Sequence, residues 1–293
     1  MLNVKIGTAP VNWNNEDVPD YRPWTEYGQM LDEMAEAGYD ATEVSSQFPA
    51  DPEQAKRDLH SRGLEAASSF VALNLRDEDI HDREADRAVE RARYLRSLGT
   101  DVLIVADSGD ERRQALAGHV SAADGLDDAR WQCLVSGLEK VADRCALEGL
   151  RIVFHNHVGS YIETEAELSR LLDTSDPARV GLCLDVGHLL FGGGDVMRVM
   201  GPYGARVQYV HLKDVDLEVL DRCRRAELGF RDALRLGIFT EFGAGGMDFD
   251  SFFAALENQG YSGWMIVEQD TTRKTPMESA RISREYLRRT LGV

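Results

Sequence analysis

The stretch 151–188, RIVFHNHVGSYIETEAELSRLLDTSDPARVGLCLDVGH, contains a complete strand–helix–strand unit. Its β-rich runs RIVFHNHV and VGLCLDVGH flank the run TEAELSRLL. That middle run opens with Thr164 and carries Glu167 three residues later, which is the spacing of a capping box at the start of a helix. Each run has an apolar stretch, IVF in the first and VGLCL in the second, that is followed by His or Asp. The stretch therefore predicts two parallel strands joined by a helix, with polar chemistry where each strand ends.

The same alternation recurs about eight times along the 293-residue chain. The other β-rich runs are VKIGTA (4–9), ATEVSS (41–46), EAASSFVAL (65–73), DVLIVADS (101–108), VQYVHLKDV (207–215) and GWMIVEQD (263–270). Because no polar linker or shift in composition interrupts the chain, we expect an α/β fold: a (β/α)₈ TIM barrel, with residues 1–293 as a single domain. A doubly wound open sheet is the alternative, weakened by the absence of a Gly-rich dinucleotide turn after the first strand.

The connection after the seventh predicted strand is unusually long. It covers 216–246, whereas such loops typically have about 2–6 residues. In a barrel this insertion lies at the carboxyl face, where active sites are built. Its GAGG sequence at 243–246 predicts a tight loop over the site; a phosphate cradle is weakly supported, because no helix-opening GK[ST] follows.

Composition limits the expected partners. The net charge of −18 disfavours nucleic acid and anionic membranes. We expect a small-molecule substrate and neither a nucleic-acid nor a membrane partner, and a homo-oligomer is left open. The cysteines form no CxxC pair, and the chain has neither a signal-peptide pattern nor an apolar stretch long enough to span a bilayer. These features predict a cytoplasmic protein with reduced thiols.

Ionisable side chains gather where the predicted strands end, the position of catalytic residues in a barrel. They are Glu43, His155, His157, Asp185, His188, His211, Lys213, Glu268 and Asp270. Three pairs among them are spaced two residues apart and so share one face of their strand. Converging imidazoles and carboxylates would repel or desolvate one another without a cation. Mixed nitrogen and oxygen ligands suit Mn²⁺, Co²⁺, Fe²⁺ or Zn²⁺.

A structural interpretation competes with the ligand interpretation at each of these positions. A single histidine is more often hydrogen-bonded in a core, but His155 and His157 on one face favour a ligand, His155, with a supporting partner. The apolar neighbours of Asp185 would make an unpaired charge costly, which favours a ligand over a turn residue. His211 lies between apolar residues and Glu268 ends a strand whose register directs it to the mouth, so both are expected to bind metal.

The roles of the remaining candidates stay open between two readings. Lys213 is either an interior ion-pair partner or a positive charge beside a developing enolate. Glu43 either accepts a substrate hydroxyl or pairs with Lys213. His188 either caps the following helix or touches substrate. Asn12 and Trp13 follow the first strand and either grip a polyol or form an ordinary polar turn.

Six segments carry a resemblance that spans nearly the whole chain. They are IGTAPVNWNNEDVP (6–19), ATEVSSQFPADPE (41–53), LDVGHLLFGGGD (184–195), YVHLKDV (209–215), GIFTEFGAGGMDF (237–249) and GYSGWMIVEQD (260–270). With these segments the chain resembles the xylose-isomerase-like TIM barrels, and within them the inosose dehydratase family. The resemblance implies a divalent cation, Mn²⁺ or Co²⁺ before Zn²⁺, Fe²⁺ or Mg²⁺, and elimination of water from a keto-cyclitol.

The resemblance also assigns metal ligands. Asp185, His211 and Glu268 match the family's metal positions, and His155 stands where sugar epimerases of the superfamily carry a metal-binding Glu. Epimerisation uses two bases, whereas elimination uses one base and one acid. The exchange of a Glu for His155 therefore favours a dehydratase over an epimerase.

These assignments predict a lyase of inositol catabolism that dehydrates 2-keto-myo-inositol (inosose) through a metal-stabilised enolate. The base is Glu268 or Glu43, and Lys213 or an imidazolium such as His157 assists the departing hydroxyl. Substrate contacts are expected from Asn12, Trp13, His188 and Asp270.

Two other activities are the alternatives. A sugar isomerase or epimerase would use the same enediolate chemistry on a ketose. A phosphodiesterase resembling the barrel-shaped DNA-repair endonucleases is disfavoured by the net charge of −18 and by the single apparent metal site.

Overall fold

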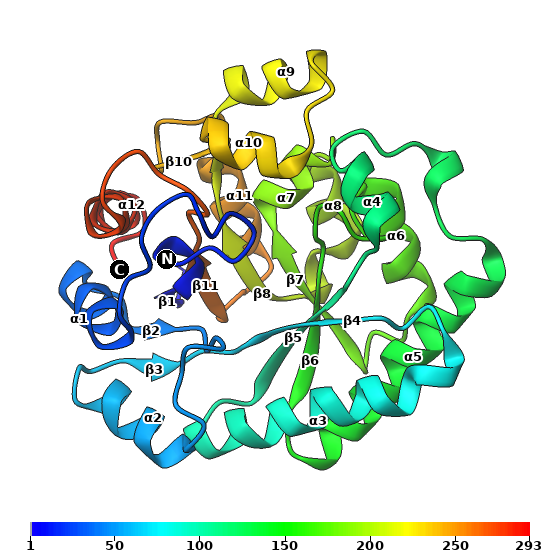
Figure 1. Ribbon diagram of the computed structural model, residues 1–293, viewed down its shortest axis with the longest axis horizontal. Coiled ribbons are helices and arrows are strands. Elements are labelled where there is room, and N and C mark those ends of the chain that lie inside the picture. Colours follow the sequence, from blue (N-terminus) through cyan, green and yellow to red (C-terminus); the bar gives the residue numbers. More distant parts are fainter. Residues whose placement is uncertain (1) are drawn as a thin grey trace. The chain divides into compact units, whose positions relative to one another are not determined.

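Parallel β-strands alternate with α-helices along the computed structural model, which describes residues 2–293 (Figure 1). The chain divides into two units. The first unit comprises the chain up to Ala67 together with Val210–Val293, and the second unit comprises Ser68–Tyr209. The alternation confirms the α/β class that the sequence predicts.

The first unit contains a parallel sheet with the strand order β3–β2–β1–β11–β8. Its strands are β1 (Lys5–Thr8), β2 (Ala41–Thr42), β3 (Glu65–Ala66), β8 (Val207–Leu212, entering this unit at Val210) and β11 (Trp264–Val267). In the β8–β11 register, Leu212 lies opposite Val267. The next residues, Lys213 and Glu268, therefore leave the sheet at the same level, which brings together two side chains far apart in sequence.

The helices of the first unit are η1 (Pro10–Asn12), α1 (Tyr27–Ala37), α2 (Pro52–His60), α9 (Leu217–Arg225), α10 (Phe230–Leu236), α11 (Phe249–Asn258) and α12 (Pro276–Leu291). Side-chain caps stand at the starts of α2 and α12. The Asp51 side chain accepts a hydrogen bond from Glu53 N at the start of α2. Thr275 and Glu278 form a reciprocal capping box at the start of α12. Both caps satisfy backbone N–H groups that a helix start leaves without intrahelical partners.

The second unit contains the parallel strands β4–β5–β6–β7 in that order. They are β4 (Phe70–Leu73), β5 (Val102–Asp107), β6 (Arg151–His155) and β7 (Val180–Asp185). The helices are η2 (Glu78–Ile80), α3 (His81–Leu98), α4 (Glu111–Leu116), η3 (Ala122–Asp124), α5 (Asp128–Leu147), α6 (Glu165–Thr174), α7 (Val186–Phe191), α8 (Val196–Tyr203) and η4 (Gly204–Arg206). Every residue of β5 and β7 is buried, as expected for parallel strands covered on both faces.

One predicted strand is divided in two. The run 65–73 forms β3, which pairs with β2, and β4, which pairs with β5. Between these two strands, the Ser68 side-chain hydroxyl donates a hydrogen bond to the Val102 carbonyl. The division coincides with the boundary between the two units. Periodicity could not reveal it, because the intervening residues are small and compatible with a strand.

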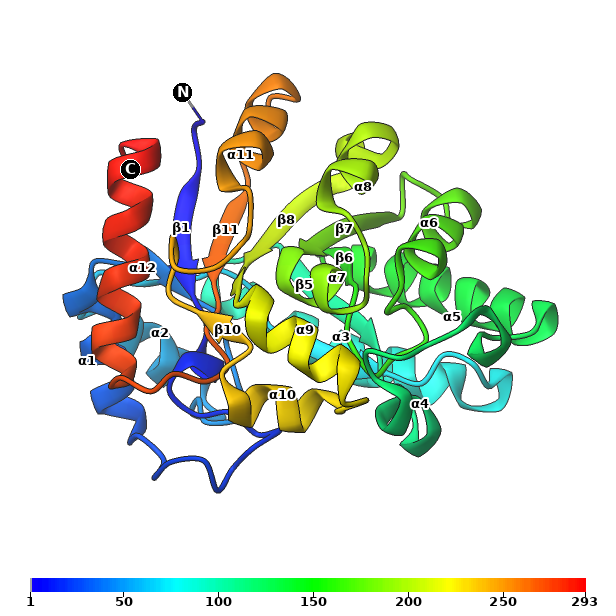
Figure 2. The same cartoon turned by 90° about the horizontal axis from the view of Figure 1, so that it is seen from above.

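The long connection after β8 has secondary structure of its own. It holds the helices α9 and α10, which pack side by side (Figure 2). The short strand β9 (Asp214–Val215) pairs antiparallel with β10 (Phe239–Thr240), which closes the insertion on itself. This long connection is therefore an insertion with regular secondary structure and not an irregular loop.

Across residues 2–293, none of the helices combines the length and the apolar character that crossing a bilayer requires. The expectation that residues 1–293 act as a single domain stays a prediction.

Candidate functional site

The histidine group lies in the second unit and consists of His155, His157, Asp185 and His188. β6 ends at His155, and β7 ends at Asp185. The His155 Nε2 atom lies 3.3 Å from Asp185 Oδ2. The rings of His157 and His188 are 4.2 Å apart between centroids, and those of His155 and His157 are 5.5 Å apart. The structure thus brings together the four strand-end candidates of this unit, all buried except the partly exposed His157.

Backbone hydrogen bonds fix Asp185. Its carbonyl accepts from the Asn156 side-chain amide at 3.0 Å, and its N–H donates to the Asn156 side-chain oxygen at 3.1 Å. Its Oδ1 atom accepts from His188 N at 2.7 Å, which caps α7. One carboxylate oxygen is therefore committed to the helix, and the other, Oδ2, faces His155.

Hydrogen bonds to Val158 distinguish the two neighbouring imidazoles. The Val158 N–H donates to His188 Nδ1 at 3.2 Å, so that nitrogen is an acceptor and the ring proton of a neutral His188 is on Nε2. His157 Nδ1 lies 2.7 Å from the Val158 carbonyl, to which it donates. The hydrogen-bond pattern therefore assigns opposite tautomers to the adjacent rings: His157 carries its proton on Nδ1, and His188 carries its proton on Nε2.

The carboxylate group lies in the first unit and consists of Glu43, His211, Lys213, Glu268 and Asp270. His211 Nε2 lies 2.8 Å from Glu43 Oε1, and His211 Nδ1 lies 3.2 Å from Glu268 Oε2. The Lys213 ammonium pairs with Glu268 and lies 3.5 Å from Asp270 Oδ1. All five side chains are buried. The structure therefore joins every strand-end candidate of this unit in one chain of ion pairs.

Carboxylates outnumber the cationic side chains within the carboxylate group. Three buried carboxylates face one lysine and one imidazole. A neutral imidazole has a single N–H, so it can donate to only one of the two carboxylates beside His211. Buried negative charge that lacks compensation is costly. The group accordingly fits an additional cation.

The donor atoms of the two groups are of the kind that transition-metal ions bind. His155, Asp185, His211 and Glu268 offer two imidazole nitrogens and two carboxylate oxygens, and all four side chains are buried. Such mixed nitrogen and oxygen donors suit Mn²⁺, Co²⁺, Fe²⁺ or Zn²⁺. That these residues are metal ligands stays a prediction, which the chemistry of the donors supports.

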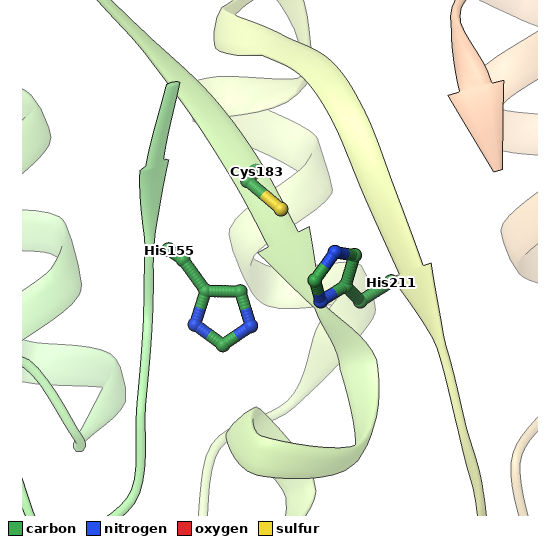
Figure 3. Close-up of side chains that lie close together, drawn as sticks. All are labelled: His155, Cys183 and His211. Carbon is green, nitrogen blue, oxygen red and sulfur yellow. The ribbon is translucent and has the colours of Figure 1, made fainter. Parts of the chain in front are cut away.

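Two residues beside the histidine group were not predicted from the sequence. Cys183 lies on β7 opposite His155 on β6, and Figure 3 shows both side chains on these neighbouring strands. Phe70, at the start of β4, is 40% exposed, and its ring lies 5.5 Å from the His155 ring and 5.8 Å from the His157 ring. Cys183 could have been found by its spacing of two residues from Asp185, whereas nothing local marks Phe70.

Asn12 and Trp13 hold the segment after β1 in place. The Asn12 amide donates to the Val267 carbonyl at 3.1 Å and accepts from Gln269 N at 2.9 Å. Trp13 is 1% exposed, and its indole N–H donates to Glu33 at 2.6 Å. These contacts give both residues a role in packing β1 against its neighbours. Whether either also contacts substrate stays a prediction.

Asp214 organises the GAGG loop. Its carboxylate accepts hydrogen bonds from the N–H groups of Gly243, Gly245 and Met247, at 2.9, 3.0 and 3.0 Å. Burial raises the pKa of Asp214, and these backbone donors oppose that rise. The tight loop expected at 243–246 is present, and it is anchored directly after Lys213.

Comparisons with known proteins agree with this architecture. Residues 31–290 match the family described as xylose isomerase-like TIM barrel. The inosose dehydratase of Geobacillus kaustophilus (strain HTA426) is 38% identical, over 97% of this chain and 94% of the relative. The enzyme of that name from Lacticaseibacillus casei is 33% identical, over 100% and 99%. The crystal structure of the IolI protein with a zinc atom has the same fold, with a TM-score of 0.71, 16% identity and coverage of 99% and 98%. These matches confirm the barrel fold and the resemblance seen in the sequence. The chain belongs to the xylose isomerase-like TIM barrel family and, within it, to the inosose dehydratases.

Proposed function

We propose that this chain is a metal-dependent hydro-lyase that removes water from a keto-cyclitol, the activity that the name inosose dehydratase gives its relatives. The observation that carries the proposal is the buried chain of groups Glu43–His211–Glu268–Lys213. It offers a carboxylate base and an ammonium within one connected network. Elimination of water next to a ketone needs this pair of functions: one group takes a proton from carbon, and positive charge supports the departing hydroxyl.

We propose that one divalent cation is held by His155 and Asp185 of the histidine group and by His211 and Glu268 of the carboxylate group. The proposal treats residues 1–293 as one barrel domain, because the carboxyl ends of barrel strands share one face. Bound there, the cation would supply Lewis-acid polarisation of the substrate ketone. Mn²⁺ and Co²⁺ are the preferred ions, and the zinc atom named for the IolI structure supports the proposal of a divalent cation. The excess of buried carboxylates supports this assignment.

Among the two candidate bases, Glu43 is the better one. Glu268 contacts both the Lys213 ammonium and the His211 ring, so its carboxylate already has two partners in the group. Among residues 2–293, the Glu43 carboxylate has one such partner, the His211 ring. We therefore assign Glu43 to remove the proton from the carbon beside the ketone, and Glu268 to orient Lys213.

Lys213 and His157 are assigned to the departing hydroxyl. Lys213 sits between Glu268 and Asp270, so its charge is held in place by two buried carboxylates. His157 is the partly exposed imidazole of the histidine group, and its Nδ1 is fixed by the Val158 carbonyl. The roles of His188 and Asp270 as contacts to substrate hydroxyls complete the proposal.

Mass spectrometry tests this function. Protein loaded with Mn²⁺ is incubated with a panel of keto-inositols and ketohexoses, and we expect a product that has lost one water from a keto-inositol. Glu43→Gln should keep its Mn²⁺ and lose about 10²- to 10⁴-fold in turnover, the range that a general base contributes. A new product of unchanged mass would instead identify an isomerase or epimerase. Undiminished dehydration by metal-free protein would refute the proposal.

A further inference from the structure

The insertion after β8 brings an aromatic ring to the Lys213 ammonium. Its strand β10 pairs antiparallel with β9, and in this register Phe239 lies opposite Val215. Lys213 stands two residues before Val215, so the Lys213 and Phe239 side chains leave the same face of the strand pair as diagonal neighbours. The Lys213 Nζ atom lies 5.5 Å from the centre of the Phe239 ring, and both residues are at most 2% exposed. The contact is therefore a buried cation–π interaction.

The segment after β11 holds both partners of this contact. Its carboxylates Glu268 and Asp270 pair with the Lys213 ammonium. The residue between them, Gln269, is buried, and its side-chain amide donates a hydrogen bond to the Phe239 carbonyl at 2.7 Å. One short segment thus fixes the ammonium through its carboxylates and the strand that carries the ring through a backbone hydrogen bond.

We infer that Phe239 is a positioning residue for Lys213, and that the insertion serves the reaction through this ring. The negative face of an aromatic ring attracts an ammonium, and the attraction is stronger where water is excluded. The carboxylates attract the ammonium from the segment after β11, and the ring adds an attraction from β10, which restricts the positions that Nζ can take. The inference rests on the proposed function, in which Lys213 supports the departing hydroxyl. Loss of the ring should therefore slow turnover and leave the binding of substrate and metal nearly unchanged.

A double-mutant cycle tests the contact without reference to catalysis. Phe239→Leu, Lys213→Met and the double variant are unfolded with urea in the metal-free form, and Phe239→Met replaces Phe239→Leu should that variant not fold. We expect the loss of the ring to lower the folding equilibrium constant about 10- to 30-fold more when Lys213 is present than in Lys213→Met, which is the size of a desolvated cation–π contact. Additive losses would overturn the inference.

Phe252→Leu supplies the matched control for this cycle. Phe252 is also buried, but it lies on α11 and its ring packs near that of Phe253. We expect its loss and that of Lys213→Met to be additive, because no cation–π contact is removed.

Fluorination separates the charge of the ring face from the shape of the ring. Trifluorophenylalanine incorporated at Phe239 keeps the ring and withdraws negative charge from its face. With a keto-inositol and Mn²⁺, we expect kcat to fall roughly tenfold both with this residue and in Phe239→Leu, while KM and the Mn²⁺ affinity measured by calorimetry change little. Phe252→Leu should keep the wild-type kcat. A wild-type kcat with the fluorinated ring would show that Phe239 only packs, and would overturn the inference.

Failure of this inference is distinguishable from failure of the proposed function. Non-additive losses in the Phe239 cycle, without dehydration by the wild-type protein, would leave the contact with Lys213 standing and remove the proposed function. Dehydration by the wild-type protein together with additive losses would do the reverse.

Discussion

The histidine group and the carboxylate group stand at the ends of parallel strands, yet they are held by different forces. In the histidine group, Asn156 and Val158 fix the side chains through neutral hydrogen bonds to the backbone. In the carboxylate group, Lys213 and His211 are fixed by ion pairs with three carboxylates. The first arrangement places one buried carboxylate beside three imidazoles, whereas in the second three buried carboxylates face one lysine and one imidazole. The carboxylate group therefore has the greater need for an added cation.

Asp185→Asn should have the largest effect, because Asp185 is the only proposed anionic ligand in the histidine group. The amide keeps the size of the side chain and removes the charge that would bind the metal. We expect loss of bound Mn²⁺ and a fall in kcat/KM of about 10⁴-fold, or roughly 5 kcal/mol, measured by elemental analysis and steady-state kinetics. Asp195→Asn is the control, since Asp195 also caps a helix but has no proposed ligand role. Equal Mn²⁺ content in both variants would show that Asp185 is no ligand.

Lys213→Met should unfold the metal-free protein more readily, because it removes the one ammonium that faces the buried carboxylates. Breaking a buried ion pair typically costs about 3 to 5 kcal/mol in free energy of unfolding, and bound Mn²⁺ should recover part of this loss. Urea denaturation with and without Mn²⁺ measures both. The exposed pair Lys140–Asp82 supplies the control Lys140→Met, for which we expect no measurable change. A Lys213 variant as stable as this control would contradict the charge imbalance.

Asn156→Ala tests the neutral hydrogen bonds of the histidine group. It leaves the buried N–H and carbonyl of Asp185 without their side-chain partner, which costs about 1 to 3 kcal/mol in stability. Since the lost contacts orient a proposed ligand, Mn²⁺ affinity should fall roughly 10- to 100-fold. Thermal unfolding and calorimetry give the two values. If stability falls and Mn²⁺ affinity does not, Asn156 supports the fold alone.

Phe70→Leu should have the smallest effect. Its ring packs edge-on against His155 at an interplanar angle of 84° and lies tilted by 44° against His157. Losing these aromatic contacts should cost about 0.5 to 1.5 kcal/mol, seen as a small drop in melting temperature. The stabilisation of the protein by bound Mn²⁺ should change by no more than this amount. A much larger loss of Mn²⁺ binding would mean that Phe70 and not the backbone positions His155.

Much of the fold could be predicted because its signals are local. The run DVLIVADS at 101–108 is apolar throughout and became the fully buried β5. The capping box at Thr164 became the start of α6. The division of the run 65–73 arises because β3 pairs with β2 and β4 pairs with β5. The residues of the run alone do not determine these pairings.

The contacts of the site could be predicted less well, because they join distant residues. Glu43 and His211 are 168 positions apart, and their pairing at 2.8 Å follows only from the strand order of the first unit. Trp13 could be taken for an exposed aromatic because its partner, Glu33, lies on α1 and not in the turn. Cys183 was overlooked because a buried cysteine on a strand is ordinarily a small apolar residue.

The most direct test of the central claim is the number of Mn²⁺ ions bound per chain, measured by calorimetry for the wild-type protein, His155→Ala and His211→Ala. These histidines come from the histidine group and the carboxylate group, respectively. The account predicts one tightly bound ion in the wild-type protein and a roughly 100-fold or greater loss of affinity in each variant. If either variant keeps one tightly bound ion, or if the wild-type protein binds two that the variants lose separately, the two groups do not share a cation.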